Sequence, residues 1–371
     1  MWKPTSPNLN ILAKQLMIWV LVPHVETDDP NIQYYYDFSQ SHDEYKKVFE
    51  ELKMDWKWQP VTVNNYRNII DEISFSANGK LPLILNLCDG DEINDTPGIS
   101  IVHYLQEKGL SYTGAKAKFY ELTTSKVTMK QAFDRAAIPT PRWEIIQNKD
   151  QTIKGIFDRL GSPLILKPAI SGGSMGIFIK NVVHTEEEME EQIRLLYEGY
   201  HGWDLTSGGL IAEQFIKGPE FTTLIVGSAE QPGACIHFQP VKRVFHSSLP
   251  ETEKFLSFDR LWEFYENESS MPGQENFFEY FLADAELIPS LKQITQDAYF
   301  AVEGSGYARV DIRMDMETKK LYILEVNAQC GLSEDEDFTS IGAILRVSEK
   351  SFSQLVLEII EEALRKNEIK N

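Results

Sequence analysis

The chain has 371 residues, of which 42% are hydrophobic and 25% charged, as expected for a globular enzyme of two or three packed units. Its formal net charge of −20 excludes nucleic acid and anionic membranes as preferred partners, because both select basic surfaces. No apolar run resembles a signal peptide or a membrane span, and the three cysteines form no CxxC pair, so we expect a cytoplasmic protein.

The first third of the chain alternates strands and helices. After a loose extension over residues 1–14, we predict strands at Leu16–Val22 and Leu81–Leu87 and helices near Ser41–Leu52 and Ile99–Lys108. Such alternation is typical of a small parallel sheet with functional loops at the carboxyl ends of its strands. Those loops are His24–Asp37 and the acidic Cys88–Gly98.

The middle third follows a boundary near Gly109–Ala115 and opens with a helix that begins at Lys126 and ends near Ala136. We predict the later strands at Trp143–Ile146, Leu164–Lys167, Ile177–Lys180, Leu210–Phe215 and Phe221–Val226, and helices at Gln151–Leu160 and Thr185–Tyr200.

Lys167 ends a buried strand and is followed by a Gly/Ser-rich loop, Ser171–Gly176. Exposed backbone N–H groups in such a loop can cradle phosphate oxygens, and a strand-fixed lysine adds a point charge. An ordinary hairpin loop is the alternative interpretation. A P-loop is excluded, because no GK[ST] sequence precedes a helix.

The pattern between Pro240 and Pro289 is irregular, and Phe245–Pro272 is typical of a long functional loop. A helix then ends at Tyr299–Gly304. The chain closes with an amphipathic helix over Ser351–Asn367.

The most informative stretch is a predicted hairpin of two strands, Ala308–Met314 and Leu321–Ala328. Because side chains alternate along a strand, Arg309, Asp311 and Arg313 share one face of the first strand.

On the second strand of this hairpin, Glu325 and Asn327 lie together, with Leu324 and Val326 behind them. A register that pairs Asp315 with Leu321 puts Asp311 opposite Glu325 and Arg309 opposite Asn327.

Facing carboxylates repel each other across strands. A divalent cation between them reverses the sign, since Mg²⁺ prefers oxygen ligands, often one or two carboxylates plus substrate phosphates. The hairpin therefore predicts a metal–phosphate site. The alternative is a solvated face with chance charges, which the apolar flanking faces disfavour.

Four motifs occur in one order along the chain. They are SKVTMKQAF at Ser125–Phe133, LILKPAISGGSMG at Leu164–Gly176, IAEQFIKGPEFT at Ile211–Thr222, and ARVDIRMD followed by LYILEVNAQCGL. This combination resembles the ATP-grasp ligases, in particular the D-alanine–D-alanine ligase branch. The resemblance implies an α/β ATP-grasp fold of three subdomains. They are an N-terminal open parallel α/β sheet (1–114), a small central α+β lid (115–216) and a C-terminal α+β catalytic subdomain with an antiparallel sheet (217–371).

The resemblance also implies roles for individual residues. Those implied for ATP binding are Lys126, Lys167, Ser174, Glu213, Ile216 and Glu220; for metal binding, Asp311, Glu325 and Asn327; for catalysis, Arg309, Gly331 and Lys167. ATP and two Mg²⁺ ions, with Mn²⁺ as a substitute, are the implied cofactors. The implied partners are a small-molecule carboxylate and an amine, and a homodimer is one option.

The implied reaction forms an amide bond. A carboxylate attacks the γ-phosphate of ATP to give an acyl phosphate, which an amine then attacks, releasing phosphate beside the ADP. Water must be excluded, so Ser171–Gly176 and Phe245–Pro272 are predicted to act as lids.

Some positions depart from the family pattern. The glycine-rich motif that seats the first amino acid is not recognisable, and the Ser-Leu pair that seats the second carboxylate is replaced by the acidic run Ser333–Asp337. An acidic loop repels a carboxylate, so we expect an acceptor amine that is cationic or lacks a carboxylate at that position.

The third phosphate-binding lysine of the family has no clear counterpart, and Lys242, Lys254 and Arg260 are the candidates. Cys330 is interpreted as a small core residue rather than a nucleophile. The main interpretation is a carboxylate–amine ligase of specialised metabolism. Two alternatives to it remain: genuine D-alanine–D-alanine ligation, and a catalytically inactive nucleotide-binding regulatory or scaffold protein. The facing carboxylates disfavour the scaffold, since a degenerate copy has no reason to keep them.

Overall fold

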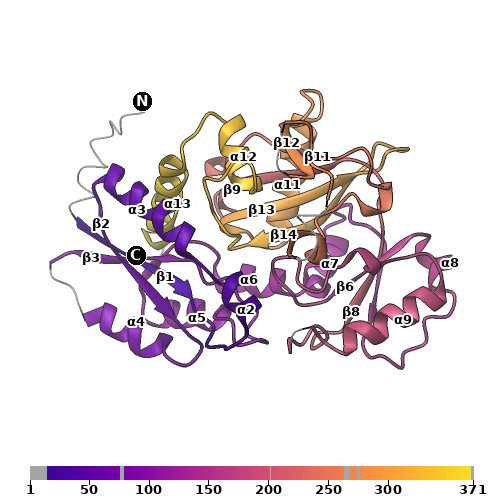
Figure 1. Ribbon diagram of the computed structural model, residues 1–371. Coiled ribbons are helices and arrows are strands. Elements are labelled where there is room, and N and C mark those ends of the chain that lie inside the picture. Colours follow the sequence, from indigo (N-terminus) through magenta and orange to yellow (C-terminus); the bar gives the residue numbers. More distant parts are fainter. Residues whose placement is uncertain (1–14, 76–78, 201, 263–267, 274–275, 369–371) are drawn as a thin grey trace.

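The computed structural model describes residues 15–75, 79–200, 202–262, 268–273 and 276–368, and it is organised around three β-sheets (Figure 1). The predicted extension over residues 1–14 lies outside the described residues. Within the described ranges, no helix is both long and apolar enough to cross a membrane.

The first sheet has the strand order β2-β1-β3-β4 and is entirely parallel, as predicted. Its strands are β1 Leu16–Pro23, β2 Asp55–Val61, β3 Leu81–Asn86 and β4 Ser111–Tyr112, and its helices are α2 Pro30–Tyr35, α3 Ser39–Leu52, α4 Tyr66–Phe75 and α5 Ile99–Glu107. The sequence analysis missed β2, because this edge strand is largely exposed and contains Pro60, which is depleted in strands.

The second sheet has the order β5-β8-β6-β7 and is antiparallel. Its elements are β5 Trp143–Ile146, α8 Ile156–Leu160, β6 Leu164–Pro168, the 3₁₀ helix Ile179–Asn181, β7 Val182–Val183, α9 Glu186–Tyr197 and β8 Leu210–Gln214.

The predicted strand at Ile177–Lys180 is wrong. The buried Asn181 side chain donates to the carbonyls of Leu166 and Gly176, both at 2.7 Å, and these bonds hold the preceding residues in a turn. The short strand β7, which begins at Val182, pairs with β6 instead.

The third sheet has the order β12-β11-β9-β13-β14, with β10 paired to β9. Its strands are β9 Glu220–Ser228, β10 Ile236–His237, β11 Val241–Phe245, β12 Phe278–Leu282, β13 Ser305–Met314 and β14 Leu321–Ala328. The accompanying helices are α10 Phe258–Trp262, α11 Ile288–Ala301, α12 Ser340–Val347 and α13 Phe352–Glu368, with 3₁₀ turns at Pro232–Ala234 and Glu251–Glu253. The irregular pattern predicted for Pro240–Pro289 is thus wrong at β11 and β12.

Helices α6 (Ala117–Thr124) and α7 (Lys126–Arg135) lie near the centre of the molecule and both pack on β14 (Figure 1). The three sheets occupy residues 16–112, 143–214 and 220–328, so each lies inside one predicted subdomain. The exact boundaries between subdomains stay predictions.

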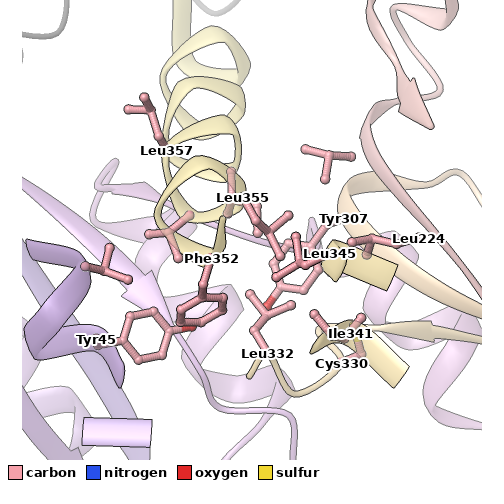
Figure 2. Packing of buried hydrophobic residues seen from close by; sticks show 14 of the residues in the cluster. Tyr45, Leu224, Tyr307, Cys330, Leu332, Ile341, Leu345, Phe352, Leu355 and Leu357 are labelled. Atoms are coloured by element: carbon pink, nitrogen blue, oxygen red, sulfur yellow. The ribbon is translucent and has the colours of Figure 1, made fainter. Parts of the chain in front are cut away.

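A hydrophobic core joins the parallel sheet to the third sheet. Helix α13, which the sequence predicts as the closing helix, lies beside α3, and the ring of Tyr45 on α3 is 5.4 Å from that of Phe352 (Figure 2). The same core contains Cys330 and Leu332, which follow β14. This packing fixes the end of β14 against the N-terminal sheet.

Candidate active site

One cavity of ≈ 490 Å³ is lined by all three parts of the fold. Every residue that the resemblance implicates borders it: Lys126, Lys167, Ser174, Glu213, Ile216, Glu220, Arg309, Asp311, Glu325, Asn327 and Gly331. Most of them lie on α7, β6, β8, β9, β13 and β14, whereas Ser174, Ile216 and Gly331 lie in the loops that follow β6, β8 and β14. The structure therefore brings the whole predicted set together.

The hairpin of β13 and β14 has the predicted pairs: Arg309 faces Asn327, and Asp311 faces Glu325. The predicted pairing at the turn is wrong, because Leu321 pairs with Met314 and not with Asp315.

A register shift between Asp311 and Ile312 accounts for this difference, since Leu324 is an extra residue in β14. Ile323 takes the buried position opposite Ile312, and the half-buried Leu324 lines the cavity. The prediction that Leu324 lies behind Glu325 is therefore wrong, because a bulge reverses the alternation of side chains on one side of it.

The facing carboxylates are surrounded by donors. Asp311 Oδ2 accepts from Arg309 Nη2 at 3.0 Å and from Asn327 Nδ2 at 2.9 Å, and its Oδ1 accepts from Thr222 at 3.1 Å. Glu325 Oε1 lies 3.5 Å from Lys126 Nζ. These donors offset the repulsion between the two acids.

Magnesium is compatible with this donor set. Two carboxylates and the Asn327 amide oxygen supply hard oxygen ligands, and phosphate oxygens of a substrate would complete the coordination. In the part of the chain that the structure describes, there is no group of three or more His, Cys, Asp or Glu able to hold a metal by itself. Metal and phosphate are thus expected to bind together.

Glu213 lies between two lysines. Its Oε1 accepts from Lys167 Nζ at 2.7 Å, and its other oxygen pairs with Lys130. Burial alone would raise the pKa of Glu213, but the two ammonium groups outweigh burial and hold that pKa below its usual range. The Glu213 carboxylate is therefore engaged in positioning Lys167, a function of its side chain that the sequence analysis did not anticipate.

Lys130 was missed by the sequence analysis. It lies one helical turn after Lys126 on α7, is 1% exposed, and also donates to Thr140 Oγ1 at 2.6 Å. Its spacing of four residues from Lys126 places both lysines on one helix face, which is the signal that could have found it.

Two arginines at the cavity were also missed. The Glu220 carboxylate pairs with Arg243 on β11 and with Arg313 Nη2 at 2.9 Å. Arg243 Nη2 also donates to Tyr280 Oη at 2.9 Å, and all three charged residues are buried. Alternation had placed Arg313 on the strand face of Asp311 without giving it a role, whereas Arg243 lies in the segment interpreted as irregular.

None of the candidates for a third phosphate-binding lysine borders the cavity. Lys242 is 3.5 Å from Asp284, Lys254 pairs with Glu251, and Arg260 pairs with Glu253 and Glu268. Among the described residues, the cationic side chains that line the cavity are Lys126, Lys167, Arg243, Arg309 and Arg313.

Cys330 borders the cavity but is 6% exposed and belongs to the core, as predicted. Burial raises the pKa of its thiol to about 11, so the reactive thiolate is scarce at neutral pH. The adjacent Gly331 has open space where a side chain would lie.

The loop Ser171–Gly176 lines the cavity, and the later segment Phe245–Pro272 contacts the residues that follow this loop. Phe255 and Leu256 line the cavity, and the Asp259 carboxylate accepts from the backbone N–H of Ile179 at 3.2 Å. Residues 263–267 of this segment lie outside the described residues.

The acidic run Ser333–Asp337 does not aim its charges at the cavity. Glu334 pairs with Lys47 at 3.0 Å, Asp335 accepts from the backbone N–H groups of Asp337 and Phe338, and Glu336 lies 3.8 Å from Arg346. The reason given from sequence for a carboxylate-free acceptor therefore does not hold at this loop.

The three-sheet arrangement is the ATP-grasp fold. D-alanine–D-alanine ligase from Bacillus anthracis complexed with ATP superposes with a TM-score of 0.66 at 19% identity, over 96% of this chain and 99% of that one. The enzyme from Coxiella burnetii superposes with a TM-score of 0.65 at 16% identity, over 96% of this chain and 97% of that one.

A sequence model of the family described as D-ala D-ala ligase C-terminus matches residues 133–361, and the chain belongs to this family. The D-alanine–D-alanine ligase of Desulfotalea psychrophila is 30% identical over 63% of this chain and 65% of its own length. The D-alanine–D-alanine ligase of Polaromonas naphthalenivorans is 26% identical over 70% of this chain and 72% of the relative's length. The chain thus spans just under two thirds of the first of these relatives.

Proposed function

We propose that the protein is an ATP-dependent ligase that joins a carboxylate to an amine through an acyl phosphate and releases ADP and phosphate. The facing pair Asp311 and Glu325, flanked by Lys126 and Arg309 in one cavity with Lys167, carries this proposal. Family membership and the ATP-grasp fold support the same reaction.

Asp311, Glu325 and Asn327 would hold two Mg²⁺ ions, with Mn²⁺ as a substitute. Bound there, the ions supply charge neutralisation at the phosphates. Lys126 and Lys167 bind the phosphates, and Arg309 stabilises the transferred phosphoryl group and the tetrahedral oxyanion.

The rest of the cavity binds the nucleoside and excludes water. Ile216, which follows β8, contacts the base, and Glu220 accepts from the ribose hydroxyls. A carboxylate has about four acceptor sites, of which the two arginines use two, so acceptor capacity remains at Glu220. Ser174 covers the phosphates, and the Gly331 N–H lies beside the reacting carbonyl.

Leu324 is expected to contact the base, because the bulge in β14 turns it into the cavity. Leu324→Ala should weaken ATP binding by about tenfold, since full burial of a leucine is worth about 1.5–3 kcal/mol. Isothermal titration calorimetry measures this. Ile323→Val is the control: it should cost about 0.5–1.5 kcal/mol of unfolding free energy and leave ATP affinity unchanged. Equal effects of the two variants on ATP binding would contradict the bulge assignment.

The reaction is tested by phosphate release over a matrix of amino acids and amines. We expect release that requires ATP, Mg²⁺ and a carboxylate, and a hydroxamate when hydroxylamine replaces the amine, because an acyl phosphate reacts with it. Mass spectrometry identifies the amide product. Binding of ATP without ADP formation from any pair would support the inactive scaffold instead.

Genuine D-alanine–D-alanine ligation is the second candidate, favoured by the names of the relatives. Release that is maximal with D-alanine alone would select it. A cytoplasmic location is also proposed, since the cysteines are free. A homodimer stays a prediction from the resemblance.

A further inference from the structure

A second cavity of ≈ 300 Å³ adjoins the first. Phe38, Asp89, Ser171 and Gly173 line both, so the two cavities meet beneath the lid loop. A site of this size suits a small molecule.

The wall of the second cavity is aromatic and acidic. The ring of Trp203 lies 5.8 Å from that of Tyr35 and 6.1 Å from that of Tyr36, and the carboxylates are those of Asp89, Asp91 and Asp204. No Lys, Arg or His occurs among its described lining residues. Aromatic faces and carboxylates attract a cation, while a free carboxylate would meet no compensating charge.

These carboxylates differ in how far they are engaged. Asp204 accepts from the backbone of Thr206 and Ser207, and Asp91 Oδ1 accepts from the backbone N–H of Ile93. Among the described residues, no other side chain donates a hydrogen bond to Asp89; its own backbone N–H and the charge of Arg309 act on the carboxylate. Asp89, which lines both cavities, is thus the carboxylate best able to bind a ligand there.

The environment of Asp89 favours proton transfer as well as binding. Asp89 is exposed at the cavity, and desolvation by the surrounding protein raises its pKa to about 6; its own backbone N–H opposes this rise, Asp91 adds to it and Arg309 opposes it. A carboxylate with a raised pKa is a stronger base than an ordinary one.

The lid loop Ser171–Gly176 contributes Ser171 and Gly173 to the walls of both cavities. A side chain at Gly173 would collide with the Tyr35 hydroxyl, so the lid loop lies directly on the end of α2. On the other side, Asn94 Nδ2 donates to the Asp204 carbonyl at 3.2 Å and Asp204 N donates to Asn94 Oδ1 at 2.9 Å. These contacts place the lid loop and the Asn94–Asp204 pair at the rim of the second cavity.

We propose that the second cavity binds the acceptor substrate, a primary ammonium compound with an apolar or aromatic body and no carboxylate, and that Asp89 binds its ammonium group. This assignment of the acceptor rests on the proposed ligase function. An acceptor without a carboxylate is thus expected because of this cavity, and not because of the acidic run Ser333–Asp337.

The proposed step is the attack of the acceptor amine on the acyl phosphate. The ammonium gives one proton to Asp89, and the free amine nitrogen then forms a bond to the acyl carbon while the bond from that carbon to the phosphate oxygen breaks. The second nitrogen proton leaves with the departing phosphate, and Asp89 returns its proton to solvent. Arg309, which donates to Asp311 at 3.0 Å and whose charge acts on Asp89, would stabilise the phosphoryl group beside this acceptor.

Calorimetry with phenethylammonium chloride tests the site, with uncharged 2-phenylethanol as the isosteric probe. Asp89→Asn is expected to weaken binding of the ammonium probe by at least about tenfold, as loss of a charge-assisted hydrogen bond does. The exposed Asp95 lies in the same loop, and Asp95→Asn should change nothing. The inference is overturned if wild type does not bind the ammonium probe, binds the alcohol equally well, or binds as tightly after Asp89→Asn.

Hydroxylamine separates this inference from the proposed function, because it is uncharged at neutral pH and needs no ammonium site. If the wild type forms a hydroxamate but Asp89→Asn binds the ammonium probe as tightly as the wild type does, the amine site alone is refuted. Asp89-dependent probe binding without hydroxamate from any carboxylate would refute the ligase function and, with it, the assignment of the cation as acceptor.

Discussion

Asp311→Asn is expected to lower kcat for phosphate release by about 10²–10³-fold, the usual effect of removing one preorganised electrostatic group. The substitution removes one of the two charges proposed to hold magnesium, and it frees Arg309 from its partner on the same strand. Asparagine has nearly the same shape and still accepts from Thr222, so the fold should persist.

The measurement is steady-state phosphate release over a Mg²⁺ titration, with thermal unfolding in parallel. Glu325→Gln should behave similarly, because Glu325 faces Asp311 across the hairpin. The matched control is Glu317→Gln in the exposed hairpin turn, which should retain wild-type rates and Mg²⁺ dependence. A normal Mg²⁺ dependence in Asp311→Asn would remove the central argument for the site.

Glu213→Gln is expected to cost about 3–5 kcal/mol of unfolding free energy, because it leaves a buried ammonium without its counter-charge. Lys130 is 1% exposed, and it also donates to Thr140, which carries no charge. Denaturant unfolding measures the loss. Catalysis should fall as well, since Glu213 also holds Lys167 at 2.7 Å.

The pH dependence of this loss has a definite sign. The folded-state pKa of Glu213 lies below the unfolded value, so its contribution is present above about pH 4.3, the usual glutamate pKa. The contribution disappears as pH falls through the folded-state pKa, and the difference between wild type and variant should shrink in acid. Glu144→Gln, which breaks an exposed pair with Arg159, should cost only about 0–1 kcal/mol. Equal losses of unfolding free energy in the two variants would show that the buried pairs of Glu213 with Lys130 and Lys167 stabilise the fold no more than an exposed pair does.

Local patterns in the sequence were enough to predict most residues of the candidate site. Alternation along β13 put Arg309 and Asp311 on one face. The facing pairs were predicted from a turn pairing of Asp315 with Leu321 that is wrong, and they occur because the bulge at Leu324 shifts the register by one residue. The buried strand before Lys167 and the Gly/Ser loop after it were equally local patterns. These features depend on residues close together in the chain, which is why composition and periodicity reveal them.

Only the tertiary structure decided features that depend on distant partners. The bulge that turns Leu324 into the cavity reflects the packing of β14 on α6 and α7, and the turn at Asn181 exists because that side chain satisfies carbonyls from β6 and the lid. Arg243 and Asp89 acquire their positions from strands and loops far apart in the sequence. Buried charges and hydrogen-bonding groups need partners wherever the fold supplies them, and no local pattern encodes where that is.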